Sequence, residues 1–245
     1  VALTSDQIDK LTATQVGAMS ATQVKAIESD DLALMTDNQV AAFSTAAVAN
    51  MTTDQVAALA SNQVAALTTA QVKSLTTAQV ASLTSAQIDK LSATQVGAMT
   101  AAQVKAIESD DLALMTDAEV AAFSTAAVAN MTTDQVAALA SNQVAALTTA
   151  QVKSLTTAQM VSLTTSQIDK LTTAQLSALG TAQVAAMETQ DFAKLTTEQV
   201  ASFSATQFKA LKTSQIESLT TDQAKALTTS QLAALSTAQM KAVET

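Results

Sequence analysis

Several residue types that most enzymes use are missing from this chain. Its 245 residues include no cysteine, histidine, proline, tryptophan, tyrosine or arginine. Without histidine or cysteine there is no Ser-His or Cys-His nucleophile pair, no thiolate chemistry and no usual zinc site. We therefore predict that the protein is not an enzyme and that it holds no cofactor.

Glycine, aromatic residues and charges are also scarce. The chain has three glycines, and 2% of its residues are aromatic and 13% charged, while 48% are hydrophobic. Folds with many sharp turns normally use glycine and proline to make them, so this composition disfavours a β-sandwich, a barrel or a Rossmann-type fold. A net charge of −9 argues against nucleic acid as a partner. No apolar run approaches the roughly 18 residues of a membrane-spanning helix, so we predict no membrane-spanning segment.

The residues that are present form one octapeptide repeated along the whole chain. Every eighth position from Leu3 to Val243 is Leu, Met, Ile, Phe or Val, with no insertion. A second large apolar position runs from Ile8 to Met240, with Ala224 as its exception, and 24 of the 30 positions from Gln7 to Gln239 are Gln. The six exceptions are Asp31, Ala47, Asp111, Glu119, Ala127 and Asp191. We interpret residues 1–245 as a single array of about 30 octads.

A longer period of 80 residues overlies the octads. Residues 19–79 nearly repeat as 99–159, and Phe43, Phe123 and Phe203 keep the same spacing. This pattern indicates block duplication, with blocks at 1–80, 81–160 and 161–240. Because both ends of the chain stop in phase with the octad, we expect it to be a segment of something longer.

Each octad contains a complete signal for the start of a helix. In the octad that begins at Thr68, the sequence Thr-x-x-Gln is a capping box, and Leu67 and Val72 occupy the positions of a hydrophobic staple. The alternative is one continuous helix with Thr and Gln on its surface. Two helical turns take about 7.2 residues, however, so a period of 8 would rotate the apolar stripe by roughly 80° per octad. The capping interpretation explains why Ser or Thr, Gln, Leu and Val recur together.

The energetics of one octad require octads to stack. Burying one Val and one Leu yields roughly 3–6 kcal/mol, whereas ordering eight residues costs on the order of 8–16 kcal/mol in backbone entropy. We predict an all-α fold, a repetitive α-solenoid with one very short capped helix of five or six residues per octad, wound as a right-handed superhelical rod. We expect Ala57, Ala65 and Ala66 to let successive helices approach closely.

Three acidic clusters depart from the repeat, at residues 28–31, 108–111 and 188–191. One interpretation is that acids favour a helix N-terminus through the helix dipole, with Asp in place of Gln in the box. The alternative is a calcium site, because hard cations bind clustered carboxylate oxygens. Its ligands would be Asp30, Asp31, Asp110 and Asp111. These clusters lack the Gly-punctuated spacing of a calcium loop, so we predict no metal site.

We interpret the other departures from the octapeptide repeat as core packing or as lost helix caps. Phe43, Phe123 and Phe203 stand at the Leu position, Phe192 and Phe208 at the Val position, and we expect all five in the core. Most methionines also stand at the Leu position and are read as core packing rather than metal ligands. Ala60, Ala140, Gly180 and Lys212 replace the capping residue, and Ser61 and Ser141 are placed to move the cap by one residue.

With its TTAQVxxL octads, as in residues 148–155, the sequence resembles the octapeptide-repeat regions of very large, adhesin-like, bacterial secreted or surface proteins. The resemblance covers the whole chain and implies an extracellular or cell-surface location. We expect a structural repeat protein that forms an extracellular filament, stalk or surface fibre and associates with itself, side by side or end to end, and possible partners include other cell-surface components. The alternative is a rigid spacer or binding region of a giant bacterial adhesin.

Overall fold

The computed structural model describes residues 4–243 and shows an all-α chain. These residues form 30 helices of four to seven residues, one for each octad, and contain no strand. The prediction of an α-solenoid of very short capped helices is confirmed. Leu3, the first residue of the apolar series, lies outside the described residues.

The chain divides into two compact units, unit 1 (Val1–Ala127) and unit 2 (Val128–Thr245). The boundary falls inside α16 (Thr125–Asn130). The other helices of unit 1 are α1 (Ser5–Asp9), α2 (Ala13–Gly17), α3 (Ala21–Lys25), α4 (Ser29–Leu34), α5 (Asp37–Ala41), α6 (Thr45–Asn50), α7 (Thr53–Ala58), α8 (Ser61–Ala66), α9 (Thr69–Ser74), α10 (Thr77–Ala81), α11 (Ser85–Ile88), α12 (Ala93–Ala98), α13 (Ala101–Lys105), α14 (Ser109–Leu114) and α15 (Asp117–Ala122).

Unit 2 continues the same pattern. Its helices after α16 are α17 (Thr133–Ala138), α18 (Ser141–Ala146), α19 (Thr149–Ser154), α20 (Thr157–Ser162), α21 (Thr165–Asp169), α22 (Thr173–Ala178), α23 (Thr181–Ala186), α24 (Thr189–Phe192), α25 (Thr197–Ala201), α26 (Ala205–Lys209), α27 (Thr213–Glu217), α28 (Thr221–Lys225), α29 (Thr229–Ala234) and α30 (Thr237–Val243).

Most helices begin at a capping box, although α4, α6, α14 and α24 have none. In α9, the hydroxyl of Thr68 accepts from the Gln71 N–H at 3.2 Å, and the Gln71 Oε1 accepts from the Thr68 N–H at 2.7 Å. The helix ends where Leu75 adopts φ −56° and ψ 138°, while the Leu75 N–H still donates to the Val72 carbonyl. No described residue has a positive φ. The bends therefore need neither glycine nor proline, which accounts for the scarcity of both.

The lost caps leave the helix boundaries unchanged. At α8 the cap residue is still Ala60, whose N–H donates to Gln63 Oε1 at 2.7 Å. The expectation that Ser61 and Ser141 move the cap by one residue is wrong, because α18 is likewise capped at Ala140. Gly180 and Lys212 also keep the cap position and donate their N–H to the Gln of the box. The Gln half of the box is sufficient to set the register.

The core is a line of large apolar side chains from the Val and Leu positions. Val72 is fully buried and Leu75 nearly so, and the five phenylalanines are at most 3% exposed. The rings of Phe192 and Phe203 stack with their centroids 5.6 Å apart. The alanines contribute less than predicted, since Ala57 and Ala66 are half-buried and Ala65 is exposed.

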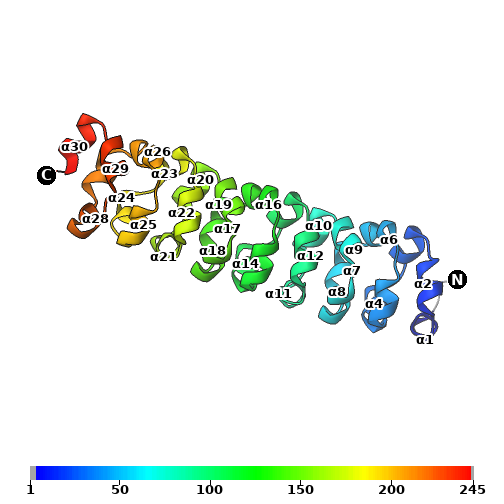
Figure 1. Ribbon diagram of the computed structural model, residues 1–245. Coiled ribbons are helices and arrows are strands. Elements are labelled where there is room, and N and C mark those ends of the chain that lie inside the picture. Colours follow the sequence, from blue (N-terminus) through cyan, green and yellow to red (C-terminus); the bar gives the residue numbers. More distant parts are fainter. Residues whose placement is uncertain (1–3, 244–245) are drawn as a thin grey trace. The chain divides into compact units, whose positions relative to one another are not determined.

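Within each unit, helices pack against the helix three octads further along. In unit 1, α3 contacts α6, α6 contacts α9, and α9 contacts α12; in unit 2, α17 contacts α20 and α20 contacts α23. Figure 1 shows α1, α4, α8, α11 and α14 along one edge of unit 1, and α18, α21, α25 and α28 along one edge of unit 2. Because α1 and α11 are ten octads apart with α4 and α8 between them, ten octads make three turns of the solenoid.

Glycine at two positions permits close packing between turns. A Cβ added at Gly97 in α12 would lie 3.0 Å from the Ala122 carbonyl oxygen, and one added at Gly17 in α2 would lie 3.1 Å from the Ala42 carbonyl oxygen.

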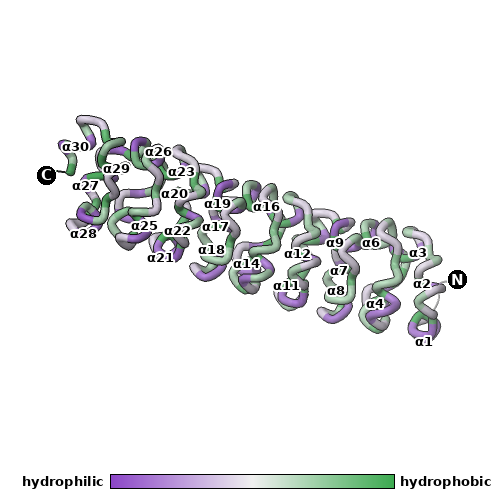
Figure 2. The backbone as a smooth tube through the Cα atoms, in the orientation of Figure 1, coloured by the Kyte–Doolittle hydropathy of each residue, from purple (hydrophilic) through white to green (hydrophobic). Residues whose placement is uncertain are grey.

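Figure 2 shows hydrophobic and hydrophilic segments alternating along the chain in each unit. This alternation is expected when each octad has one side in the core and one side facing outward.

Candidate functional site

In many octads the Gln side chain forms a second set of contacts beyond the capping box. The Gln71 Nε2 donates to the Phe43 carbonyl at 2.7 Å and is also within hydrogen-bonding distance of the carbonyls of Ala41, at 3.1 Å, and Val40, at 3.3 Å. These three carbonyls lie at the C-terminal end of α5, one turn of the solenoid earlier. One amide therefore caps the start of its own helix and the end of another.

This contact recurs through both units with a constant spacing. The acceptor 28 residues earlier lies 2.5–2.8 Å from the Nε2 in every octad of the set named below. We call this set the glutamine ladder. It comprises Gln39, Gln55, Gln63, Gln71, Gln79, Gln87, Gln95 and Gln103 in unit 1, and Gln159, Gln167, Gln175, Gln183, Gln199, Gln207, Gln215, Gln223, Gln231 and Gln239 in unit 2.

The glutamine ladder is part of the core. Its side chains are at most 6% exposed, and no buried side-chain nitrogen or oxygen among the described residues lacks a hydrogen-bond partner. Because a helix leaves its last carbonyls without a partner, a solenoid of very short helices has to satisfy many of them. The ladder does this with one amide per octad and links each helix to the helix four octads later.

Sequence reasoning identified these Gln residues as caps but missed the ladder. The capping box accepts Glu as readily as Gln, because it needs only an acceptor at that position. Yet 24 of the 30 positions are Gln and one is Glu. An amide differs from a carboxylate in having two N–H donors. The preference for Gln over Glu was thus the available signal that a donor is required.

The acidic clusters do not gather into a metal site. Asp30 and Asp110 are exposed, while Asp31 and Asp111 are 8% and 6% exposed and point away from water. Across residues 4–243, no three Asp or Glu side chains lie close enough together to hold a metal ion. Glu28 and Glu108, which precede these helices, make no side-chain cap hydrogen bond.

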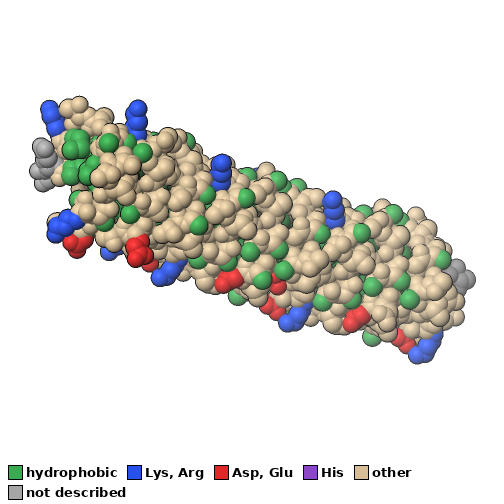
Figure 3. All heavy atoms as spheres, viewed as in Figure 1, with side chains coloured by type: hydrophobic (Ala, Val, Ile, Leu, Met, Phe, Trp, Pro, Cys, Tyr) green, Lys and Arg blue, Asp and Glu red, His purple; other side chains and the backbone are tan. Residues whose placement is uncertain are grey.

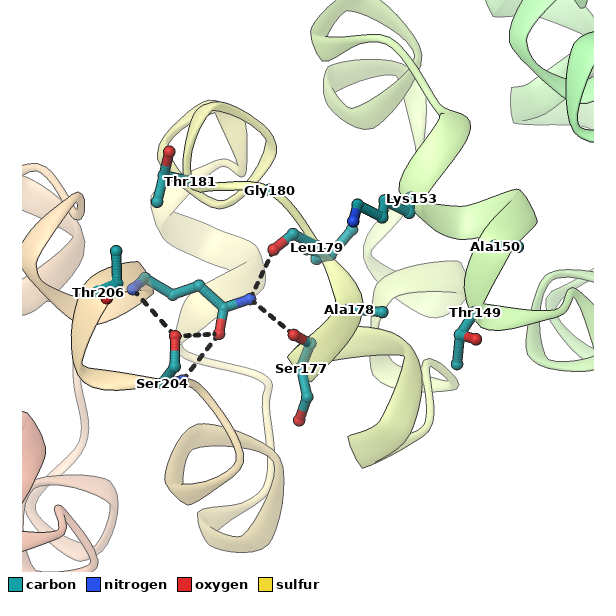
Figure 4. A pocket seen from close by; sticks show the side chains of 11 residues that line it. Thr149, Ala150, Lys153, Ser177, Ala178, Leu179, Gly180, Thr181, Ser204 and Thr206 are labelled. Carbon is teal, nitrogen blue, oxygen red and sulfur yellow. Dashed lines mark hydrogen bonds between the residues drawn. The ribbon is translucent and has the colours of Figure 1, made fainter.

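A shallow hollow of about 620 Å³ lies between successive turns of unit 2. Figure 4 shows that its lining comes from α19, α22, α23 and α26 and includes Lys153, Ser177, Gly180 and Ser204. Gly180 widens it, because a Cβ there would find only the Gln183 Oε1, at 3.5 Å, within contact distance. Lys153 is the one titratable side chain in the lining; the rest are hydroxyl, amide and small apolar groups.

Charged side chains are scattered over the surface. On the face drawn in Figure 3, lysine and acidic side chains are scattered along the edges, and most of the surface is other side chains and backbone. The ion pairs found join exposed side chains that are one or three residues apart in sequence, such as Lys10–Asp9 at 2.7 Å and Lys90–Asp89 at 2.9 Å. Such pairs contribute roughly 0–1 kcal/mol each. Over residues 4–243, no helix is long and apolar enough to cross a membrane.

Stacked capped octads joined by an internal ladder define an α-solenoid repeat protein. The comparison with known families gives the same class, because the model of the ALTTAQ repeat matches residues 24–61, 56–93, 104–141, 137–165, 157–187 and 184–221. These matches cover well over half of the chain, which therefore belongs to the ALTTAQ repeat family. No curated protein matches the chain significantly.

Proposed function

We propose that the chain is a structural element of an extracellular filament, stalk or surface fibre, in which the number of octads sets the length. The observation that carries this proposal is the constant spacing of the glutamine ladder. Each Nε2 meets a carbonyl 28 residues earlier, so an octad of any other length would break the hydrogen bonds of a whole turn. Such a protein changes in length by whole octads while its cross-section stays the same.

Self-association is part of this proposal, and the expected partner is a second copy. Only 13% of the residues are charged, and much of the exposed surface is Ala, Ser and Thr. Two leucines, Leu34 and Leu114, are 61% and 63% exposed at equivalent places in α4 and α14. Few charges and exposed apolar groups favour contact between copies, side by side or end to end.

Imaging of the purified protein tests the proposal. We expect elongated particles by cryo-electron microscopy, and a variant in which residues 69–148 are duplicated should be longer by the length of ten octads with unchanged width. Analytical ultracentrifugation should show association that increases with protein concentration. A compact globule, a single straight helix or an unchanged length in the duplicated variant would refute the structural role. Immunogold labelling of intact cells tests the extracellular location.

A second candidate is a rigid spacer of a giant adhesin, which presents a binding domain encoded elsewhere in the gene. The glutamine ladder supports it as well, because hydrogen bonds between successive turns resist stretching. The full-length gene separates the two candidates: flanking ligand-binding domains favour the spacer, whereas octads at both ends favour the filament. In both, the role is mechanical, without catalysis or a cofactor.

A further inference from the structure

The glutamine ladder is interrupted at Asp191, whose side chain is 2% exposed. The spacing of the ladder assigns the carbonyls of Met160 and Leu163, at the end of α20, to this position. An Asp side chain is one methylene shorter than Gln, and its ionised form has no N–H to donate. Among the described residues of unit 2, no side-chain amide replaces it at these two carbonyls. At position 191 the chain therefore has a carboxyl group where the ladder residues have an amide N–H donor.

The surroundings of Asp191 favour its neutral form. Burial raises the pKa of the Asp191 carboxyl above its ordinary value, and the nearby Glu188 carboxylate adds to the shift. Two hydrogen bonds act in the opposite direction and lower this pKa: one from the Thr165 hydroxyl in α21, which donates to Asp191 Oδ1 at 2.8 Å, and one from the Glu188 backbone N–H. A second hollow, of about 420 Å³, lies beside this position and is lined by Glu188, Val161 and Lys212. Val161 is 47% exposed, whereas Met160, the core residue of α20, is fully buried.

Few other charges lie on the elements around Asp191. The helix that would be its ladder partner, α20, carries none. The charged side chains on or beside α21, α24, α27 and α28 are Asp169 and Lys170, paired at 3.4 Å; Glu188 and Lys194; Lys212 and Glu217; and Asp222 and Lys225, paired at 3.7 Å. In the Asp169–Lys170 and Asp222–Lys225 pairs, the positive and negative charges cancel each other. Among these groups, Glu188 is the one that shifts the titration of Asp191.

We propose that Asp191 is a pH-operated break in the glutamine ladder. A neutral carboxyl group accepts a hydrogen bond from the Thr165 hydroxyl and is buried without a charge, so it leaves the contact between α24 and α21 intact. An ionised carboxylate is a buried charge without a compensating cation, and it loosens α20, α21 and α24. Since the folded state holds this proton more tightly than the unfolded state, the contribution is present at acid pH and is lost as the pH rises through the raised pKa.

Hydrogen exchange of the full-length chain, read by mass spectrometry between about pH 4 and about pH 7, tests this inference. After correction for the intrinsic exchange rate, protection of α20, α21 and α24 in the wild type should fall with rising pH more than protection of α28 and α29. In D191N and D191Q that extra loss should disappear, and D191Q, which restores the residue of the repeat, should be the more protected.

A matched control is E198Q, which removes one exposed carboxylate from unit 2 and should keep the extra loss seen in the wild type. A titration of the Asp191 carboxyl carbon by NMR gives a readout that does not depend on the folding of a variant. An unshifted titration, or an extra loss of protection that persists in both D191N and D191Q, would overturn the proposal.

Discussion

At the scale of single residues, one amide per octad determines both the start of a helix and its attachment to the rest of the fold. The Gln Oε1 accepts from a cap N–H, and the Nε2 donates to carbonyls of the preceding turn. An isolated hydrogen bond adds only about 0.5–1.5 kcal/mol net, but leaving buried groups without a partner costs about 1–3 kcal/mol. Breaking one ladder contact is therefore expected to change the free energy of unfolding by more than the contact itself contributes.

Replacing a ladder Gln by Glu should separate the two functions of the amide. In Q71E the cap acceptor remains, but the donors to the carbonyls of Phe43 and Ala41 are lost and a charge is buried. We expect a loss of at least about 1–3 kcal/mol in the free energy of unfolding. The matched control is Q15E, because Gln15 is exposed and makes only the cap contact. That variant should stay within about 0.5 kcal/mol of the wild type.

Urea unfolding followed by circular dichroism measures both variants. Equal effects of Q71E and Q15E would mean that the Nε2 contacts contribute nothing to stability.

The lost caps give a second prediction at this scale. A60T should restore the missing hydroxyl acceptor in α8 and stabilise the protein by about 1 kcal/mol, since Ala is a poor N-cap. G180T should gain only a few tenths of a kcal/mol, because Gly is nearly as good a cap as Thr. Melting curves of the two single variants provide the comparison. A larger gain from G180T than from A60T would contradict the capping account.

At the scale of the helix, each octad both starts one helix and sets the distance along the chain to the start of the next. A bend made by an extended Leu residue takes the same eight residues each time, so the next capping box always begins in phase. Helices of four to seven residues are far too short to be stable alone in water. Their stability comes from packing between turns, which depends on that phase.

Deletions test this dependence on phase. Removing residues 68–75, a complete octad, places Gln79 where Gln71 stood, 28 residues after Phe43, and the ladder continues. Removing residues 68–71 shortens the spacing between Nε2 and its carbonyl from 28 to 24 residues for the three Gln residues whose acceptors precede the deletion, Gln79, Gln87 and Gln95. We expect the first variant to keep its helix content per residue and its melting temperature to within a few degrees, and the second to lose both. Circular dichroism distinguishes the two, and equal melting would mean that phase does not matter.

The difference between what sequence predicted and what it missed has a physical basis. The capping box and the short helices depend on contacts three or four residues apart, so Thr68 and Gln71 suffice to predict them. The ladder depends on how many octads complete a turn, which follows from side-chain packing between helices rather than from any local pattern. Hence Gln71 was predicted as a cap, while its contact with Phe43 was not. The same limit explains why Asp191 was predicted as a substitute for Gln in the capping box, whereas its burial was not predicted.

At the scale of the whole molecule, the 80-residue period matches the geometry of the solenoid. Ten octads make three turns, so residues 80 positions apart return to the same edge of a unit. In unit 1 this places the exposed Leu34 of α4 and Leu114 of α14 on one edge. A duplication of any other number of octads would have distributed these features around the solenoid. A block of ten octads therefore keeps equivalent residues on the same face of the solenoid. A constant face is suited to contact with other copies of the chain.

Charge is distributed unevenly between the two units. Unit 1 contains 5 lysines and 13 acidic residues, whereas unit 2 contains 7 lysines and 8 acidic residues. Several acids of unit 1, including Asp30 and Asp110, are exposed, and self-repulsion among them opposes the folded state. Salt screens such charges, since the Debye length falls from about 30 Å at about 0.01 M to about 8 Å at about 0.15 M.

Added sodium chloride should therefore stabilise unit 1 more than unit 2. We expect hydrogen exchange in unit 1 to slow between about 0.01 M and about 0.15 M salt, by a difference on the order of 1 kcal/mol, with a smaller change in unit 2. The double variant D30N/D110N should reduce the salt response of unit 1, because it removes two exposed charges without touching the ladder or the caps. An equal response in both units would show that charge repulsion is unimportant.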